Sequence, residues 1–226
     1  MQYLPKPILQ AILELYKNKT TLKGVEGSEV EYLLSKGMLN SVYGMCVTDI
    51  VRPENIYNGE WEKSPITEET TAEQIEKYNK SKNRFLYYAW GVWVTAWARR
   101  NLWTGILNIA DDYIYSDTDS IKFLNYEKHT DFIDWYNKQI EEKLKKMCQF
   151  RQIDFSMCKP KTIKGKEKLI GVWDLEGVYS KIKTLGAKRY IYEQDGKLHI
   201  TIAGLSKSNG VEYMLKACNN DIDKVF

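Results

Sequence analysis

The first part of the chain alternates apolar and polar residues at helical spacing. Pro5 and Pro7 are tolerated only because they stand at the start of this pattern, which predicts a helix over residues 4–15. Ser28 stands three residues before Glu31, the spacing of a capping box, so we expect a second helix from there to about residue 46. The apolar stripe of the first helix is Ile8, Ile12 and Leu15.

The middle of the chain predicts one exposed segment and two long helices. Residues 52–71 are polar and include two prolines and a glycine, which is typical of a surface excursion. A tryptophan-rich helix is predicted over residues 85–109 and an amphipathic helix over residues 129–150. The first of these helices has tryptophans at helical spacing, which favours a core stripe of Trp90, Trp93 and Trp97.

Strand-like patterns follow. The pattern of residues 113–124 predicts two short strands around an acidic tip. In the last third we expect strands over residues 170–178, 187–193 and 197–203, and the dipeptide Asp195-Gly196 between the last two is a strong hairpin signal. Helices and strands of this kind, without a repeat or a flexible linker, predict an α+β fold.

Composition narrows the class of protein. Of the 226 residues, 43% are hydrophobic, which is enough to form the core of one domain or of two small ones. Because 28% of the residues are charged and only five are prolines, the disordered and low-complexity classes are excluded. The longest nearly apolar run, residues 89–98, falls well short of the roughly 18 residues that a membrane span needs. The first ten residues lack the pattern of a signal peptide, so we expect a cytoplasmic protein with no membrane partner.

The cysteines and the net charge narrow the class of protein less than the composition does. The four cysteines are far apart and form no Cys-x-x-Cys pair, which excludes a zinc finger and predicts buried or free thiols. The formal net charge is only +3, but residues 159–190 hold nine Lys and Arg against three acids. Such a run is either a solvated face or a surface that follows a phosphate backbone, and the pattern leaves both interpretations open.

Asp117 and Asp119 form an acidic tip between the two strands of residues 113–124. Flanked by small hydroxyls, the two carboxylates face solvent or a cation. A plain polar turn is one interpretation. A calcium loop is excluded, because its sixth position is Lys122 instead of Gly and its twelfth is Lys128 instead of Glu. The third interpretation is half of a two-metal phosphoryl-transfer site, where oxygen ligands hold hard divalent cations.

The helix after Ser28 has two different faces. Lys36, Asn40 and Tyr43 share one face at about 100° per residue, and a lysine suits a triphosphate while a tyrosine ring can stack on a base or sugar. We expect the opposite face to dock the helix, although an ordinary amphipathic helix is the alternative to a nucleotide site. This opposite, apolar face consists of Leu34, Met38, Val42 and Met45.

Three motifs in this order resemble those of the family B DNA polymerases, and more narrowly of the protein-primed polymerases of phages and linear plasmids. They are Lys36-x-x-x-Asn40-Ser41-x-Tyr43-Gly44, Tyr115-x-Asp117-Thr118-Asp119-Ser120 and Lys188-Arg189-Tyr190. Two further stretches agree with that group: Thr95-Ala96-Trp97-Ala98-Arg99 before the acidic tip and Ala203-Gly204-Leu205 after the last hairpin. The resemblance covers residues 4–208.

The resemblance implies a site and a fold. Asp119 would be the principal metal ligand with Asp117 beside it, for Mg²⁺ or Mn²⁺, and Lys188 and Tyr190 would grip the primer terminus. Lys36 would contact the phosphates of a deoxynucleoside triphosphate, Asn40 and Tyr43 would line the nucleotide pocket, and Tyr43 would also exclude a ribose 2′-hydroxyl. The implied architecture begins with a helical fingers element over residues 1–50. A palm follows over residues 51–205, with an antiparallel sheet backed by helices such as residues 129–150. Residues 206–226 would be the start of a thumb.

The resemblance also has a gap. The family's further aspartate, in an Asp-x-x-Ser-Leu-Tyr-Pro segment before the nucleotide helix, has no counterpart in the printed sequence, and neither has its exonuclease domain. We therefore expect the fingers-and-palm portion of a DNA-directed DNA polymerase that is inactive alone, in the host cytoplasm if phage-encoded. Primer–template DNA, an N-terminal polymerase portion and a terminal protein are its implied partners. The alternative is a non-catalytic nucleic-acid-binding remnant or subunit of a split polymerase.

Overall fold

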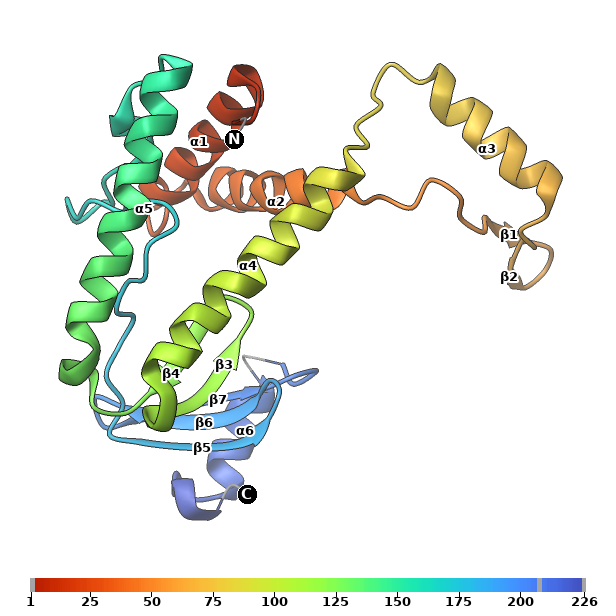
Figure 1. Cartoon of the computed structure of the whole chain (residues 1–226). Coiled ribbons are helices and arrows are strands. Elements are labelled where there is room, and N and C mark those ends of the chain that lie inside the picture. The colour runs from red at the N-terminus through yellow and green to blue at the C-terminus, as the bar shows by residue number, and fades with distance from the viewer. Residues whose placement is uncertain (1–2, 207–208, 225–226) are drawn as a thin grey trace. The chain divides into compact units, whose positions relative to one another are not determined.

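The computed structural model describes residues 3–206 and 209–224 and has a mixed α+β fold (Figure 1). Helices make up about 52% and strands about 16% of the chain, in small antiparallel sheets, so the expected fold class is confirmed. The chain divides into two compact units: Met1–Trp97 with Glu142–Ile170, and Ala98–Glu141 with Gly171–Phe226. Across the described ranges, no helix combines the length and the apolar character that crossing a membrane requires.

The first unit is mainly helical. The two long helices α4 (Tyr88–Ile109) and α5 (Thr130–Arg151) contribute residues to both units. The remaining elements of the first unit are α1 (Lys6–Thr21), α2 (Glu29–Cys46), β1 (Asn55–Tyr57), β2 (Trp61–Lys63), α3 (Glu68–Lys80) and the 3₁₀ helix η3 (Phe155–Cys158).

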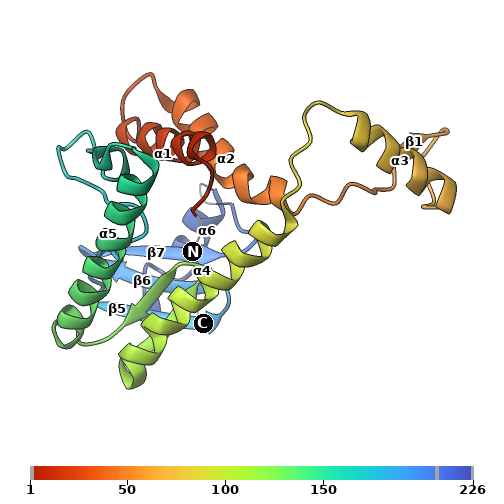
Figure 2. The same cartoon turned by 45° about the horizontal axis from the view of Figure 1, so that its top comes forward.

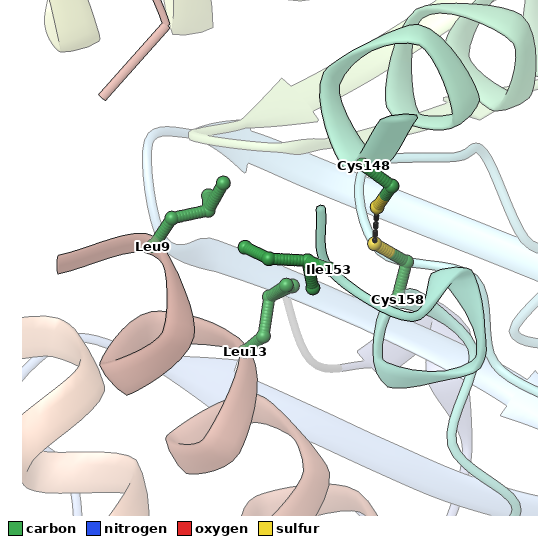
Figure 3. Packing of buried hydrophobic residues seen from close by; sticks show 5 residues of the cluster. All are labelled: Leu9, Leu13, Cys148, Ile153 and Cys158. Carbon is green, nitrogen blue, oxygen red and sulfur yellow. Dashed lines mark hydrogen bonds between the residues drawn. The ribbon is translucent and has the colours of Figure 1, made fainter. Parts of the chain in front are cut away.

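The core of the first unit joins α1 to the end of α5 and to η3 (Figure 3). Leu9 and Leu13 are the buried apolar residues of α1, so the stripe predicted over Ile8, Ile12 and Leu15 was wrong by one residue, and its members are half-buried. The three core residues outside α1 are Cys148, Ile153 and Cys158. Helical spacing identified the helix, but the position of its packing partners decided which face is buried.

The cysteines are all buried free thiols, as expected. The Sγ atoms of Cys148 and Cys158 lie 3.5 Å apart in the core shown in Figure 3. Burial, followed by the neighbouring Cys148 thiol, raises the pKa of Cys158 to about 12, so this side chain stays a neutral thiol at physiological pH. The pair therefore acts as part of the apolar packing.

Helix α2 begins where the sequence predicts, but without the predicted capping box. Ser28 is the N-cap residue, and its side chain accepts no capping hydrogen bond. A reciprocal capping box is present instead at α3, where Thr67 and Thr70 bond to each other's backbone N–H. The polar segment over residues 52–71 is largely exposed, as expected, but it forms the β1–β2 hairpin and the start of α3, which its composition did not reveal.

The tryptophan stripe of α4 is not a core. Trp93 is 63% and Trp97 is 41% exposed, and Trp90 is half-buried, so the expected buried stripe is wrong. The helix instead packs through glycines. A side chain at Gly91 would collide with Val47 in the first unit, and a Cβ at Gly105 would lie 2.6 Å from Ile121 Cδ1 in the second. These close approaches place other faces of α4 inward.

The second unit combines a hairpin and a three-stranded sheet, each antiparallel. Ile191, Ile200 and Ile222 form its core on the face of the sheet that α6 covers. Both views show the β3–β4 hairpin against this sheet (Figures 1 and 2). The elements are β3 (Tyr113–Asp117), β4 (Ser120–Phe123), β5 (Lys181–Gly186), β6 (Arg189–Gln194), β7 (Lys197–Ile202), α6 (Asn209–Ala217) and the 3₁₀ helices η1 (Ala110–Asp112), η2 (Tyr126–His129) and η4 (Ile222–Lys224).

Most of the predicted strands are confirmed. The hairpin around the acidic tip and the β6–β7 hairpin form as expected, and Asp195 and Gly196 turn with φ of +52° and +70°. The strand expected over residues 170–178 is wrong, because the Asn137 side chain bonds both the N–H and the carbonyl of Trp173 at 2.8 Å and takes the place of a strand partner. The sheets are all antiparallel, and the acidic hairpin forms a two-stranded ladder of its own beside the three-stranded sheet of β5, β6 and β7.

Asp112 fastens the base of the acidic hairpin. One carboxylate oxygen lies 2.9 Å from His129 Nε2, and the other accepts a hydrogen bond of 2.7 Å from Asn125 Nδ2. The backbone carbonyl of Asp112 accepts from the N–H of Leu124 at 2.8 Å. The bonds from His129 and Asn125 lower the pKa of the Asp112 carboxyl, so it stays ionised at neutral pH and holds the hairpin ends together.

Candidate metal and nucleic-acid site

The acidic tip is a tight turn between β3 and β4. Asp117 pairs with Ser120, and Thr118 between them has φ of +57°. The Asp117 carbonyl accepts from the Asp119 N–H at 2.7 Å, and the Thr118 hydroxyl donates to Asp117 Oδ1 at 2.9 Å. Asp117 is half-buried and Asp119 is exposed. The turn therefore holds the Asp117 carboxylate by a hydrogen bond from Thr118 and leaves that of Asp119 open to solvent.

Lys188 is the cation that the structure brings to this tip. Its Nζ lies 3.6 Å from Asp117 Oδ2. Its backbone is held on both sides: the N–H donates to the Tyr115 hydroxyl at 2.9 Å across 73 residues of sequence, and the carbonyl accepts from Ala203 at 2.9 Å. Lys188 also has φ of +55°, a strained region for a residue with a side chain. Two of the predicted motifs therefore meet here.

Tyr190 lies two residues further on, in β6. Its ring is tilted against that of the buried Tyr115 with centroids 5.2 Å apart. The Lys122 ammonium lies 5.2 Å from the Tyr190 ring centroid. Tyr115 and Lys122 belong to the site although the sequence assigned them no role. The available signals were the tyrosine that opens the acidic motif and a lysine between two apolar residues of a short strand.

The carboxylate oxygens at the acidic tip are suitable ligands for one side of a hard divalent cation. Asp117 and Asp119 offer carboxylate oxygens, the ligands that Mg²⁺ prefers. Within residues 3–206 and 209–224, no group of three or more His, Cys, Asp and Glu is placed to hold a metal. The two aspartates thus form a partial ligand set, and Lys188 neutralises one of them in this structure.

The three residues of the predicted nucleotide face lie on α2, in the first unit. Lys36, Asn40 and Tyr43 are all exposed, in keeping with the prediction that they project from the helix. The opposite stripe does not dock the helix, however. Leu34 is 60% and Met38 is 58% exposed, because α2 packs through a different face whose buried members are Ser35 and Cys46.

The basic segment over residues 159–190 divides between the two units. Lys159 pairs with Glu167 at 3.2 Å, which is the behaviour of a solvated face. Lys188 lies at the acidic tip. Within this segment, Lys188 is therefore the lysine that the structure places at the predicted acidic site.

No family model, curated protein or solved structure matches this chain in the comparisons with known proteins. What the chain does is therefore inferred from its own residues and their geometry, together with the resemblance of its motifs.

Proposed function

We propose that the chain is the fingers-and-palm portion of a DNA-directed DNA polymerase of the protein-primed family B type, acting on primer–template DNA and deoxynucleoside triphosphates. The single observation that supports it best is the meeting of the acidic tip with the Lys188-Arg189-Tyr190 turn. The Nζ atom of Lys188 lies 3.6 Å from Oδ2 of Asp117, and the Tyr115 hydroxyl accepts a hydrogen bond from the backbone N–H of Lys188. Carboxylates for a metal and a lysine for a phosphate are thus held side by side.

The roles follow from the chemistry of each residue. Asp119 and Asp117 would hold Mg²⁺, which would supply activation of the primer hydroxyl and neutralisation of charge on the reacting phosphate. Lys188 and Tyr190 hold the primer terminus, since an ammonium binds phosphate and a tyrosine ring packs on sugar or base. Lys36, Asn40 and Tyr43 bind the incoming nucleotide. Positioning and charge are what phosphoryl transfer asks of a protein.

Metal binding at the acidic tip should depend on Asp119. Asp119→Asn is expected to weaken Mn²⁺ binding about tenfold or more, because affinity for a hard cation follows the number of charged ligands. The measurement is a titration followed by the electron paramagnetic resonance signal of free Mn²⁺. Asp195→Asn is the matched control, since Asp195 also stands in an exposed hairpin turn. Equal affinities for the wild type and Asp119→Asn would remove the metal from the proposal.

DNA binding should depend on salt and on Lys188. Lys188→Ala is expected to weaken binding of every primer–template sequence alike, because phosphate contacts carry no sequence information. The slope of log affinity against log salt should fall by about 0.9 for one lost phosphate contact. Fluorescence anisotropy between low and moderate salt measures both effects, with Lys197→Ala as the control, an exposed lysine of the same sheet. An affinity that does not change with salt would mean that the basic turn is only a solvated face.

A second candidate is a nucleic-acid-binding subunit without catalysis of its own. The observation that favours it is the partial ligand set, since the described residues place only two carboxylates at the tip and no group of three. Both candidates bind primer–template DNA through Lys188 and Tyr190. They differ in whether a further carboxylate, supplied by another polypeptide, produces nucleotide incorporation.

A further inference from the structure

Lys122 lies in a cage of three tyrosine rings within the second unit. Its Nζ is 5.2 Å from the ring centroid of Tyr179, 5.2 Å from that of Tyr190 and 6.0 Å from that of Tyr192. An ammonium at these distances is attracted by the negative faces of the rings. The cage joins three segments, because Lys122 belongs to β4, Tyr190 and Tyr192 to β6, and Tyr179 to the chain before β5. We call these four residues the tyrosine cage.

The tyrosine cage lies on one defined face of the three-stranded sheet. Tyr190 and Tyr192 alternate with Ile191, which is fully buried on the opposite face beneath α6. The ring of Tyr192 stacks on that of His199 from β7, with centroids 4.9 Å apart and planes 12° apart. Tyr179 packs against Tyr192 with centroids 4.3 Å apart. This face of the sheet therefore carries a connected cluster of aromatic rings, in which the tyrosines are half-buried.

The Lys122 ammonium has no acidic partner among the described residues. Among the described residues Lys122 forms no ion pair, whereas Lys188 at the neighbouring turn pairs with Asp117. Lys122 is half-buried, so part of the residue faces solvent. Burial raises the pKa of the Tyr179 and Tyr192 phenols, which keeps both as neutral hydroxyl donors. The cage thus presents a cation with adjacent hydroxyls and no ion-paired carboxylate in the described part of the chain, and the Glu176 carboxylate lies near enough to contribute to the raised pKa of both phenols.

We propose that the tyrosine cage binds a phosphodiester of the primer strand through Lys122, as a second phosphate contact beside Lys188. This rests on the function proposed above. A polynucleotide fits better than a free anion, because the cation lies among half-buried tyrosine rings whose exposed parts can contact a sugar or base. The cage also includes Tyr190, the residue assigned to the primer terminus, so a strand held there continues directly onto Lys122.

The test is the salt dependence of binding by Lys122→Met, which keeps the length of the side chain and removes its charge. Relative to wild type, the slope of log affinity against log salt should fall by about 0.7 to 0.9, the value for one phosphate contact. Lys122→Arg should restore the slope, because a guanidinium keeps both the charge and the attraction to the rings. Lys197→Met, an exposed lysine of β7 outside the cage, should leave it unchanged.

A second measurement uses the wild-type chain and does not depend on a variant that folds. Amine acylation followed by mass spectrometry should show that primer–template DNA protects Lys122 and Lys188 and leaves Lys197 reactive. The triphosphate of an incoming nucleotide is the other source of the same phosphate chemistry. Magnesium dATP without DNA should therefore leave Lys122 reactive, and protection by dATP alone would overturn the assignment to the primer strand.

The outcomes separate the two proposals. In the first outcome, wild type binds DNA with a salt-dependent affinity and Lys188→Ala lowers the slope, but Lys122→Met leaves the slope unchanged and DNA leaves Lys122 reactive. Lys122 then only connects the hairpin to the sheet, and the inference about Lys122 is wrong while the proposed function stands. If wild type binds no primer–template DNA at any salt concentration, the proposed function fails and the inference falls with it.

Discussion

Primer extension by the 226-residue chain alone should not rise above background, and it should appear when a second polypeptide supplies the missing carboxylate. The physical reason is that, in the proposed function, Asp117 and Asp119 would provide only one side of a two-metal site, and the described residues place no group of three or more His, Cys, Asp and Glu to hold a metal. Losing a bridging ligand removes several kcal/mol of charge stabilisation in the transition state. This corresponds to a rate lower by a factor on the order of 10³ or more.

The experiment adds a polypeptide that carries an Asp-x-x-Ser-Leu-Tyr segment and follows Mg²⁺-dependent extension of a labelled primer. Extension should vanish with Asp119→Asn or Lys36→Ala and persist with Asp195→Asn, an acid of a different hairpin turn. The same polypeptide with its aspartate changed to asparagine is the matched control. It should associate with the chain without producing activity.

Three results would decide between the candidate functions. Restored extension that needs Asp119 supports the polymerase. DNA binding without extension, in a complex shown to have formed, supports the non-catalytic subunit. Robust extension by the purified chain alone, lost in Asp119→Asn, would show that the site is complete and that the expected need for another carboxylate is wrong.

Ile191→Ala should lower the free energy of unfolding by about 2–5 kcal/mol, the usual cost of truncating a buried isoleucine. Ile191 is fully buried and packs with Ile200 and Ile222 on the α6 side of the sheet. Urea unfolding followed by circular dichroism measures the change. Leu185→Ala is the matched control, because Leu185 belongs to the same sheet but is 53% exposed, and its truncation should stay within about 0.5 kcal/mol.

A loss below about 1 kcal/mol for Ile191→Ala would contradict the packing described for the second unit. The variant also bears on function, because Ile191 stands between Tyr190 and Tyr192 in β6. DNA binding by Ile191→Ala should therefore be measured only where the variant remains folded.

Local backbone chemistry explains which elements could be predicted. Asp195-Gly196 turns as expected, because both residues adopt the positive φ that these residue types tolerate. Helix α2 begins after Ser28, although the expected capping bond is absent. The strand expected over residues 170–178 failed because a distant side chain, Asn137, satisfies the backbone of Trp173. No local pattern contains that contact.

Burial was less predictable than helix position. The stripes on α1, α2 and α4 were each read from apolar spacing, which reports the sides of a helix but not the side that meets a partner. In α4 the packing positions include Gly91 and Gly105, which carry no hydrophobic signal at all. Trp93 is exposed as a result.

The sequence by itself determined the β3–β4 and β6–β7 hairpins, most helix positions and the residue types at the candidate site, because these turns and helices follow from the preferences of neighbouring residues. Only the tertiary structure decided that Lys188 lies 3.6 Å from Asp117 and that its backbone bonds the Tyr115 hydroxyl. It also decided that Lys122 lies among three tyrosine rings. These contacts join segments up to 73 residues apart, and they exist because the packing of the hairpin against the sheet, which no local pattern encodes, brings the segments together.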